Sequence, residues 1–534
     1  MPLESPNIFG GPDMLNRRQF LLVMGALGAL AGLPQARSRA GTSGIQFGTA
    51  KPFSFDELKR RAKTMATKPY EEPLVRHDQV LESIDYDAFQ QIVFKRERGL
   101  GEDGSVNFPA QFFHLGRYFK VPVKVHALED GQSREILYRS EYFNFGGTSL
   151  GKIFPDDLGF SGFRLQDGPG ATTDWMAFLG ASYFRSSGEL NQYGLSARGV
   201  AIDPALPTPE EFPRFTEFWL EPGAPDSKEY VIYALLDGPS VTGAFRMVCI
   251  KNQQIVMDID ANLYARQDIK RLGVAPLTSM FWYAENNRHQ IRDWRPEIHD
   301  NDGLAMWTGA GERIWRPLNN PSSVMTNSFV DTNPKGFGLL QRDRAFYHYE
   351  DDGVFYDRRP SVWIEPVGEW NEGEIQLIEI PTDDEIHDNI VIYWLPKEPV
   401  KAGSEWHYAY RLHWVATEPY PSEAVARVNH TRLGNAGIPG QPRPKGGRKF
   451  VIDFEGGPLN EVEKLDKVQP VINTSKGRID NEYALQIVGT KNWRAFFDLY
   501  VEGKEPVNLR LFLKLGDRTL TETWLYQYLP FSYE

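Results

Sequence analysis

Apolar and polar positions alternate through most of the chain and predict β-strands separated by short polar turns. Residues 245–265, FRMVCIKNQQIVMDIDANLYA, alternate in two runs on either side of a polar turn. The same rhythm recurs in VPVKVHALE, EYVIYALLDG, QLIEI, IVIYWL, HYAYRLHWV and LRLFLKLGD. Because few helical segments separate these runs, we predict an all-β protein built from large antiparallel sheets.

One helix is predicted near residue 55. Ser54 and Glu57 form the pattern of a capping box, in which the serine accepts a hydrogen bond from the third helical residue. Apolar residues then recur at helical spacing, namely Phe55, Leu58, Ala62 and Met65.

The amino-acid composition of the sequence changes near residue 416. Residues 416–427 hold two prolines, and a Gly- and Pro-rich stretch, GNAGIPGQPRPKGGRK, follows soon afterwards. We interpret residues 416–427 as a linker. Beyond it, six or seven short strands have the size and rhythm of an immunoglobulin-like β-sandwich, which we place at residues 428–534. The region before the linker, residues 41–415, is expected to form the larger N-terminal domain.

The first forty residues have the pattern of an export signal. Arg17 and Arg18 precede a short apolar core, Leu21–Leu33, and Ser38 and Ala40 occupy small-residue cleavage positions. The arginine pair favours a twin-arginine signal over an ordinary secretory leader. The predicted partner of the precursor is therefore the twin-arginine export machinery, and the predicted location is the periplasm.

Two features of this segment qualify the prediction. The apolar core is too short to span a bilayer, so we expect no membrane span. Met14 lies just upstream of the arginine pair and is an alternative start to Met1.

Composition narrows the choice of ligand. The net charge is −12 without a basic stripe, which argues against a nucleic-acid partner. Aromatic residues make up 13% of the chain, which suits β-sheets and also suits a groove where sugar rings stack. The single cysteine, Cys249, permits no intrachain disulfide and no cysteine metal site, and its alternating neighbours predict a buried strand thiol. We expect no metal and no cofactor.

Two short motifs do not carry the chemistry that they resemble. Residues 147–151, GTSLG, match the nucleophile elbow of serine hydrolases, but that elbow needs a helix directly after it and Pro155 stands in the way. Residues 299–303, HDNDG, resemble the start of a calcium loop, but Leu304 occupies a ligand position and no properly spaced glutamate follows.

Three acidic segments remain as candidate chemistry. Residues 382–389, TDDEIHDN, lie between two strand-like runs; the others are residues 295–321, which begin RPEIHDNDG, and residues 356–366, YDRRPSVWIEP. Asp388 stands at the mouth of an apolar strand and Asp300 precedes another, so each is placed beside a cleft or partly buried. Glycoside hydrolysis needs two carboxyl groups of this kind, with aromatic and arginine side chains to hold the sugars.

Long blocks of the sequence resemble the periplasmic glucan biosynthesis protein family, which has G-type and D-type branches. They include FLGASYFR, YGLSARGVAID, EEFPRFTEFW, YALLDGPSVTGAF, RPLNNP, NPKGFGLLQRDR, RPSVWIEP and ETWLYQY. The twin-arginine pattern and residues 262–281, NLYARQDIKRLGVAPLTSMF, are more similar to the D-type branch.

The resemblance implies a fold and an activity. It implies a large N-terminal sandwich of the kind found in carbohydrate-active enzymes, followed by an immunoglobulin-like domain. It also implies a role in making osmoregulated periplasmic glucans, as an anomer-inverting endo-β-1,2-glucanase. Asp388 in the DNIV block would then be the general acid and Asp300 in the IHD block the general base. The residues expected to orient the sugar or a proton relay are Tyr356, Arg359, Trp363, Glu385 and His299.

Two other functions stay open at this point. The chain could bind glucan without catalysis and organise its synthesis, or it could transfer glucan chains rather than hydrolyse them. The two aspartates favour an enzyme whose substrate is β-1,2-linked glucan. The sequence does not decide between a monomer and a homodimer.

Overall fold

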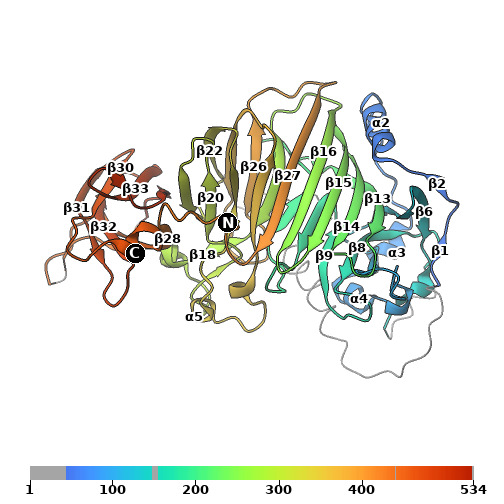
Figure 1. Ribbon diagram of the computed structural model, residues 1–534, viewed down its shortest axis with the longest axis horizontal. Coiled ribbons are helices and arrows are strands. Elements are labelled where there is room, and N and C mark those ends of the chain that lie inside the picture. Colours follow the sequence, from blue (N-terminus) through green and yellow to red (C-terminus); the bar gives the residue numbers. More distant parts are fainter. Residues whose placement is uncertain (1–43, 147–153, 439, 532–534) are drawn as a thin grey trace.

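The computed structural model describes residues 44–146, 154–438 and 440–531, and it is almost entirely β-sheet (Figure 1). The predicted all-β sandwich fold is therefore confirmed. The predicted export signal at residues 1–40 and the motif at residues 147–151 lie outside the described residues.

The first large sheet holds the longest strands, which lie side by side in Figure 1. Its path runs β6, β5, β13, β14, β15, β16, β27, β24, β23, β20 and β21. In the same order the bounds are Gln132–Leu137, Lys124–Glu129, Arg214–Pro222, Glu229–Asp237, Val241–Lys251, Ile255–Ala265, Glu405–Val415, Ser361–Val367, Gly336–Leu340, Gly303–Trp307 and Arg313–Pro317. Two short strands, β1 (Gln46–Phe47) and β2 (Lys51–Pro52), pair with β6.

A second large sheet packs against the first. Its order is β22, β25, β26, β17, β11, β10, β9, β8 and β4, with β12 paired to β17. The bounds are Met325–Thr332, Glu372–Glu379, Ile390–Pro396, Leu272–Ser279, Ser196–Arg198, Tyr183–Ser186, Asp174–Leu179, Phe160–Gln166 and Ala110–His114, with β12 at Ala201–Ile202. Rings from the two sheets meet in the core: Phe163 of β8 and Phe178 of β9 contact Phe218 of β13 at 5.1 and 5.5 Å between centroids. Burial of such rings on both inner faces holds the sandwich together.

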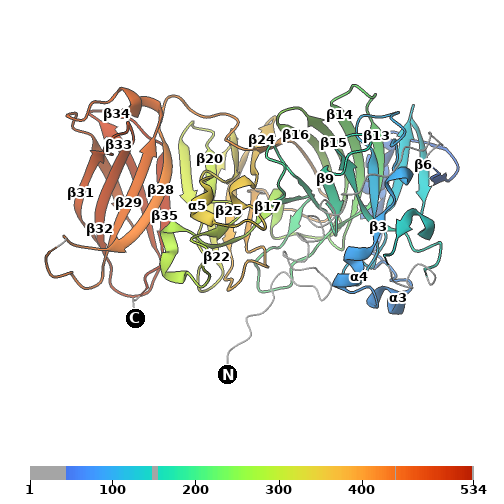
Figure 2. The same cartoon turned by 90° about the horizontal axis from the view of Figure 1, so that it is seen from below.

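The C-terminal part is a smaller pair of sheets at one end of the molecule (Figure 2). One has the order β28, β29, β32 and β31, with bounds Arg427–Asn435, Gly447–Glu455, Trp493–Tyr500 and Arg478–Gln486. The other is built from β30 (Gln469–Thr474), β33 (Val507–Leu515), β34 (Arg518–Thr519) and β35 (Thr523–Tyr528).

The C-terminal part is joined to the rest by more than the chain. Strand β35 pairs in parallel with β21 of the first large sheet, placing Trp524 beside Trp315. One apolar cluster contains Trp315, Leu340 and Trp363 from the N-terminal side together with Phe450 and Trp524 from the C-terminal side. An interface of this kind resists separation because its apolar surface would be exposed to water.

The region predicted to be a linker is partly anchored. The carboxylate of Glu418 accepts a hydrogen bond from Arg313 at 2.7 Å and lies 3.6 Å from Arg342. The Tyr420 hydroxyl donates to Glu365 at 2.9 Å. Glu423, further along, is exposed.

The predicted helix is present as α2 (Phe55–Ala66). The Ser54 hydroxyl accepts a hydrogen bond from the Glu57 N–H at 3.2 Å, as an N-cap should. Leu58 and Ala62 are buried, and the helix packs on the first large sheet, where the Thr242 hydroxyl donates to the Ala62 carbonyl. The helix prediction is therefore confirmed.

The remaining elements are short. They are α3 (Asp78–Glu82), α4 (Tyr86–Gln91), α5 (Phe346–Tyr349), the β3–β7 pair (Val93–Phe94 and Phe143–Asn144) and the β18–β19 pair (Phe281–Tyr283 and Ile298–His299). The described residues also include five 3₁₀ turns: Arg96–Arg98, Ser140–Tyr142, Glu285–Gln290, Tyr356–Arg358 and Gly457–Glu461. Cys249 lies buried on β15, as predicted, and burial raises the pKa of its thiol.

Candidate active site

The two predicted catalytic aspartates are positioned by one short segment, Ser279–Phe281. The Asp300 N–H donates to the Met280 carbonyl at 2.9 Å, and the Asn389 N–H donates to the Ser279 carbonyl at 3.0 Å. Successive carbonyls of an extended chain point to opposite sides, so Asp300 and the residue after Asp388 flank this segment. Neighbouring strands are about 4.8 Å apart, which puts the two backbones roughly 10 Å apart.

Asn389 closes the base of the loop that carries Asp388. Its side-chain oxygen accepts from the Phe281 N–H at 2.8 Å, and its amide donates to the carbonyls of Phe281 and Ile380, both at 2.9 Å. These bonds tie the two ends of residues 381–388 to each other and to Phe281 of β18. Asp388 is therefore held beside Asn389, just before strand β26 begins at Ile390, and remains partly exposed.

The phenol of Tyr183, a partly buried residue, lies in the electrostatic surroundings of Asp388. Burial raises the pKa of the Tyr183 phenol to about 12, and the negative charges of Glu210 and Asp388 act in the same direction. Tyr183 also lines a cavity of about 580 Å³, together with Tyr70, Tyr118, Phe119, Glu210 and Phe212. The cavity has aromatic walls, and the residues that line it come from outside the acidic loop 382–389.

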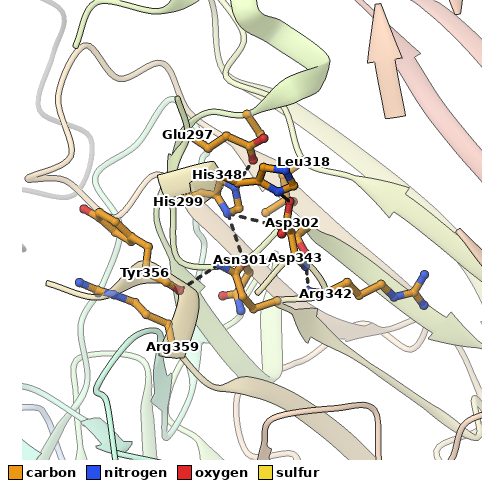
Figure 3. Close-up of polar contacts among 12 residues, drawn as sticks. Glu297, His299, Asn301, Asp302, Leu318, Arg342, Asp343, His348, Tyr356 and Arg359 are labelled. Carbon is orange, nitrogen blue, oxygen red and sulfur yellow. Dashed lines mark hydrogen bonds and ion pairs between the residues drawn. The ribbon is translucent and has the colours of Figure 1, made fainter. Parts of the chain in front are cut away.

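Asp300 is paired with an arginine inside the protein. Its Oδ1 lies 2.7 Å from Nη1 of Arg359, and both side chains are buried. The Arg359 guanidinium stacks over the ring of Tyr356 at 4.5 Å and also donates to the Val354 carbonyl at 3.2 Å. Arg359 therefore fixes the position of the Asp300 carboxylate and is itself fixed on two sides (Figure 3 shows Arg359 beside Tyr356).

Glu385 continues this chain of contacts. The hydroxyl of Tyr356 donates to Glu385 Oε2, and Arg295 donates to both Glu385 oxygens at 3.0 and 3.2 Å. Arg295 is shared with Asp351 at 2.6 Å. A continuous network thus runs from Asp300 through Arg359 and Tyr356 to Glu385, three residues before Asp388.

The acidic side chains of the loop at residues 382–389 differ in their exposure to solvent. Asp383 is exposed, whereas Asp384, Glu385 and Asp388 are partly buried. Asp383 and Asp384 directly follow the residues IPT, a pattern that predicts a solvated turn, but only Asp383 is exposed. Glu385 does join the network described above.

His299 is adjacent to Asp300 in sequence and is linked to Tyr356 through Gln341, whose side-chain amide donates to the Tyr356 carbonyl at 3.1 Å (Figure 3 shows His299 near Tyr356). Its Nε2 lies 3.0 Å from Glu297 and its Nδ1 lies 3.2 Å from the Gln341 side-chain oxygen. Burial opposes a charge on the ring, but the hydrogen bond to Glu297 and the charge of Asp302 outweigh it and raise the pKa of His299. His299 therefore serves to neutralise buried acids.

Asp302 shares this environment. Its Oδ2 accepts hydrogen bonds from the backbone N–H groups of Arg342 and Asp343. Burial raises the pKa of the Asp302 carboxyl to about 6, with His299 opposing and Asp343 adding to the rise.

One group of described residues has the composition of a metal site. Oxygen and nitrogen atoms of Glu297, Asp343 and His348 lie within 4.8 Å of one another. Hydrogen bonds join these residues to each other and to His299: His348 Nδ1 bonds Asp343, and His299 Nε2 bonds Glu297.

The structure does not favour Trp363 as a sugar platform. Its ring is wholly buried in the apolar cluster between the two parts of the molecule, packed among Trp315 and Leu340. A ring without an exposed face cannot stack on a sugar, so Trp363 is a core residue. Tyr356, Arg359 and His299 are also buried, which makes them positioning residues in this conformation.

Sequence reasoning missed several residues of this network. Arg295, Asp351, Gln341 and Asn389 hold the candidate site together through side-chain bonds. Arg295 stands at the start of the RPEIHD segment that was singled out for its acids, but no local pattern pairs it with a residue ninety positions away.

Comparisons with known proteins decide the family. The family described as "Periplasmic glucan biosynthesis protein, MdoG" matches residues 53–528. The chain belongs to this family. It is 50% identical to "Glucans biosynthesis protein D 2" of Ralstonia nicotianae, over 97% of this chain and 98% of that protein. It is 47% identical to "Glucans biosynthesis protein D" of Stenotrophomonas maltophilia, again over 97% and 98%. "Probable glucans biosynthesis protein D" of Shewanella oneidensis is 49% identical, over 90% of this chain and 89% of that protein.

Membership of the glucan biosynthesis family agrees with the resemblance seen in the sequence and places the protein in the biosynthesis of periplasmic glucans. Within the residues that the structure describes, no helix combines the length and apolarity needed to cross a bilayer.

Proposed function

We propose that this protein is an anomer-inverting endo-β-1,2-glucanase that acts on nascent periplasmic glucan. The observation that carries the proposal is the placement of Asp300 and Asp388 on either side of the Ser279–Phe281 segment. Two carboxyl groups on a rigid frame are what glycoside hydrolysis requires. The β-1,2 linkage comes from the family resemblance.

In this mechanism Asp388 donates a proton to the leaving glycosidic oxygen. Its loop is anchored by Asn389 and it remains partly exposed, so a glycosidic oxygen can reach it. The cavity lined by Tyr183, Tyr118 and Phe119 has aromatic walls on which other sugar units of a long glucan chain can stack.

Asp300 is the proposed acceptor of the proton from the attacking water. Because its carboxylate is buried against Arg359, water reaches it through an intervening relay or after a local movement. The network through Tyr356 to Glu385 orients the two ends of this path. Arg359 also balances the charge that Asp300 keeps inside the protein.

The experiment is direct. Purified mature protein is incubated with linear β-1,2-glucan, and the products are separated by chromatography, with a β-1,3-glucan as the control substrate. Shorter β-1,2-linked chains from the first substrate alone support the proposal. Binding without cleavage would favour the non-catalytic alternative, and products longer than the substrate would favour transfer.

We further propose that the precursor reaches the periplasm through the twin-arginine route. Arg17 and Arg18 followed by an apolar core support this proposal. Replacing both arginines by lysine keeps the charge and removes the recognition pair, so the precursor should remain in the cytoplasm. Normal periplasmic delivery of that variant would contradict the assignment.

A further inference from the structure

One tryptophan is unlike the rest. The sequence has 13 tryptophans, all within the described part of the chain, and Trp294 alone is largely exposed, at 71%. The others are buried or partly buried. An indole is among the largest apolar groups a protein can bury, so leaving one in water forgoes stabilisation. Packing among the described residues does not explain the placement of Trp294.

The residues on both sides of Trp294 are fixed. Arg295 donates to Asp293 Oδ1 through its backbone N–H at 3.0 Å and through Nε at 2.9 Å. The Arg295 carbonyl accepts a hydrogen bond from the Tyr283 hydroxyl at 3.0 Å. The exposed indole therefore stands on an anchored turn and loses little conformational entropy when it binds something.

The same turn is bonded to the candidate active site. The guanidinium of Arg295 donates to both carboxylate oxygens of Glu385 and to Asp351. Glu385 lies three residues before Asp388. Trp294 directly precedes Arg295, so its Cα lies about 3.8 Å from the Cα of the arginine that holds the acidic loop.

We propose that Trp294 is a sugar-stacking platform at the rim of the active site, where it binds the face of a glucopyranose ring of the glucan chain. The inference rests on the proposed function. A pyranose ring presents axial C–H groups that pack on the electron-rich face of an aromatic ring, and indole offers the largest such face. Because Arg295 clamps both the turn and Glu385, a sugar held on Trp294 is held at a fixed distance from the acidic loop.

The test compares Trp294→Ala and Trp294→Phe with the unchanged protein. Binding of linear β-1,2-glucan is measured by calorimetry in an Asp388→Asn background, and kcat and KM are measured in the active background. Trp294→Ala should weaken binding and raise KM by about tenfold, with kcat changed little. Trp294→Phe keeps an aromatic face and should restore most of the affinity. The melting temperature of each variant should match that of its parent.

A matched control is available on the C-terminal sheet. Tyr483 is 42% exposed on strand β31 and has no bond to the acidic loop among the contacts of the described residues. Tyr483→Ala should leave glucan binding unchanged.

Three results would overturn the inference. If the parent protein binds and cleaves β-1,2-glucan while Trp294→Ala does so equally well, Trp294 is not a platform and the proposed function stands. If Trp294→Ala instead changes the mass measured by light scattering and leaves glucan binding intact, the indole is a contact between two copies of this chain. If the parent protein neither binds nor cleaves the glucan, both the proposed function and this inference fail.

Discussion

Asp300 and Arg359 form an ion pair in the interior, with 2.7 Å between Oδ1 and Nη1 and side-chain exposures of 0% and 1%. Two charges in this position have lost their hydration and depend on each other and on their hydrogen bonds. The pair lies beneath the Tyr356–Glu385 contact, so it supports the site as well as the fold.

Arg359→Ala should therefore destabilise the protein strongly. Removing one partner of a buried pair costs about 3–5 kcal/mol because the other charge stays buried. The matched control is Arg358→Ala, since Arg358 is the exposed neighbour and lies 3.8 Å from Asp357. Chemical denaturation measures the free energy of unfolding of each variant. The double variant Arg359→Ala with Asp300→Asn should regain part of the loss, and equal stability of the two single arginine variants would contradict the role given to this pair.

The two aspartates should matter for turnover more than for binding. Asp388→Asn and Asp300→Asn keep the shape of the side chain and remove its proton chemistry, so kcat on β-1,2-glucan should fall by at least about a hundredfold. Asp383→Asn, in the same loop but exposed, should behave as the unchanged protein. Near-normal turnover by a folded Asp388 or Asp300 variant would remove that residue from the mechanism. Loss of stability and binding together would show that the residue only holds its loop.

Asp302 gives a prediction about pH. Burial raises the pKa of its carboxyl to about 6 in the folded protein, above its ordinary value of 3.8. Between about pH 4 and pH 6 the folded state holds a proton that the unfolded state has released, so the free energy of unfolding falls as pH rises through this window.

Asp302→Asn removes this titration while its side-chain oxygen can still accept the N–H groups of Arg342 and Asp343. Relative to the unchanged protein, the variant should gain stability from pH 4 to pH 6, on the order of 2–3 kcal/mol, and show no further gain above about pH 7. Denaturation at several pH values, in buffer with a chelator, measures the difference. A difference that does not change with pH would show that Asp302 is not the titrating group.

We propose that residues 416–427 separate two domains. The two domains are in closer contact than a flexible linker alone would require. The protease Glu-C should cut after the exposed Glu423, whereas Glu418 is bonded to Arg313. After the cut the two pieces should elute together in gel filtration, because the β21–β35 pairing and the shared apolar cluster remain. Separation of the pieces without denaturant would argue that this interface is weak.

The parts of the fold that the sequence predicted are those with a local cause. Alternation predicted the long strands β15 and β16 because each residue's neighbours two positions away share its face. The Ser54 cap and the apolar residues at helical spacing predicted α2, because both signals lie within a few residues of the helix that they specify. The pairing of β21 with β35 joins residues about two hundred positions apart, and no local pattern specifies such a partner.

In the candidate site, too, the sequence predicted local features and did not predict contacts between distant residues. Asp300 and Asp388 were found through sequence blocks, and the structure adds the Ser279–Phe281 segment that positions both. Trp363 is aromatic and near acidic residues in the sequence, but a sequence does not say which face of a strand packs against the C-terminal part of the molecule. The bond from Arg295 to Glu385 could not be predicted because its two ends are set by different loops.

The stereochemistry of the product tests the proposed mechanism most directly. The backbones that carry Asp300 and Asp388 flank a common segment and so lie roughly 10 Å apart. An inverting enzyme needs its carboxyl groups about 6.5–9.5 Å apart to admit a water, whereas a retaining enzyme brings them to about 5 Å. A backbone separation of this size accommodates the wider, inverting arrangement, and a β-1,2 bond cleaved by inversion first yields the α-anomer at the new reducing end. Proton NMR of fresh reaction mixtures, recorded before mutarotation, should show the α signal rise first and the β signal follow. If the β signal rises first, Asp388 and Asp300 do not act as an inverting pair, even if each is essential for turnover.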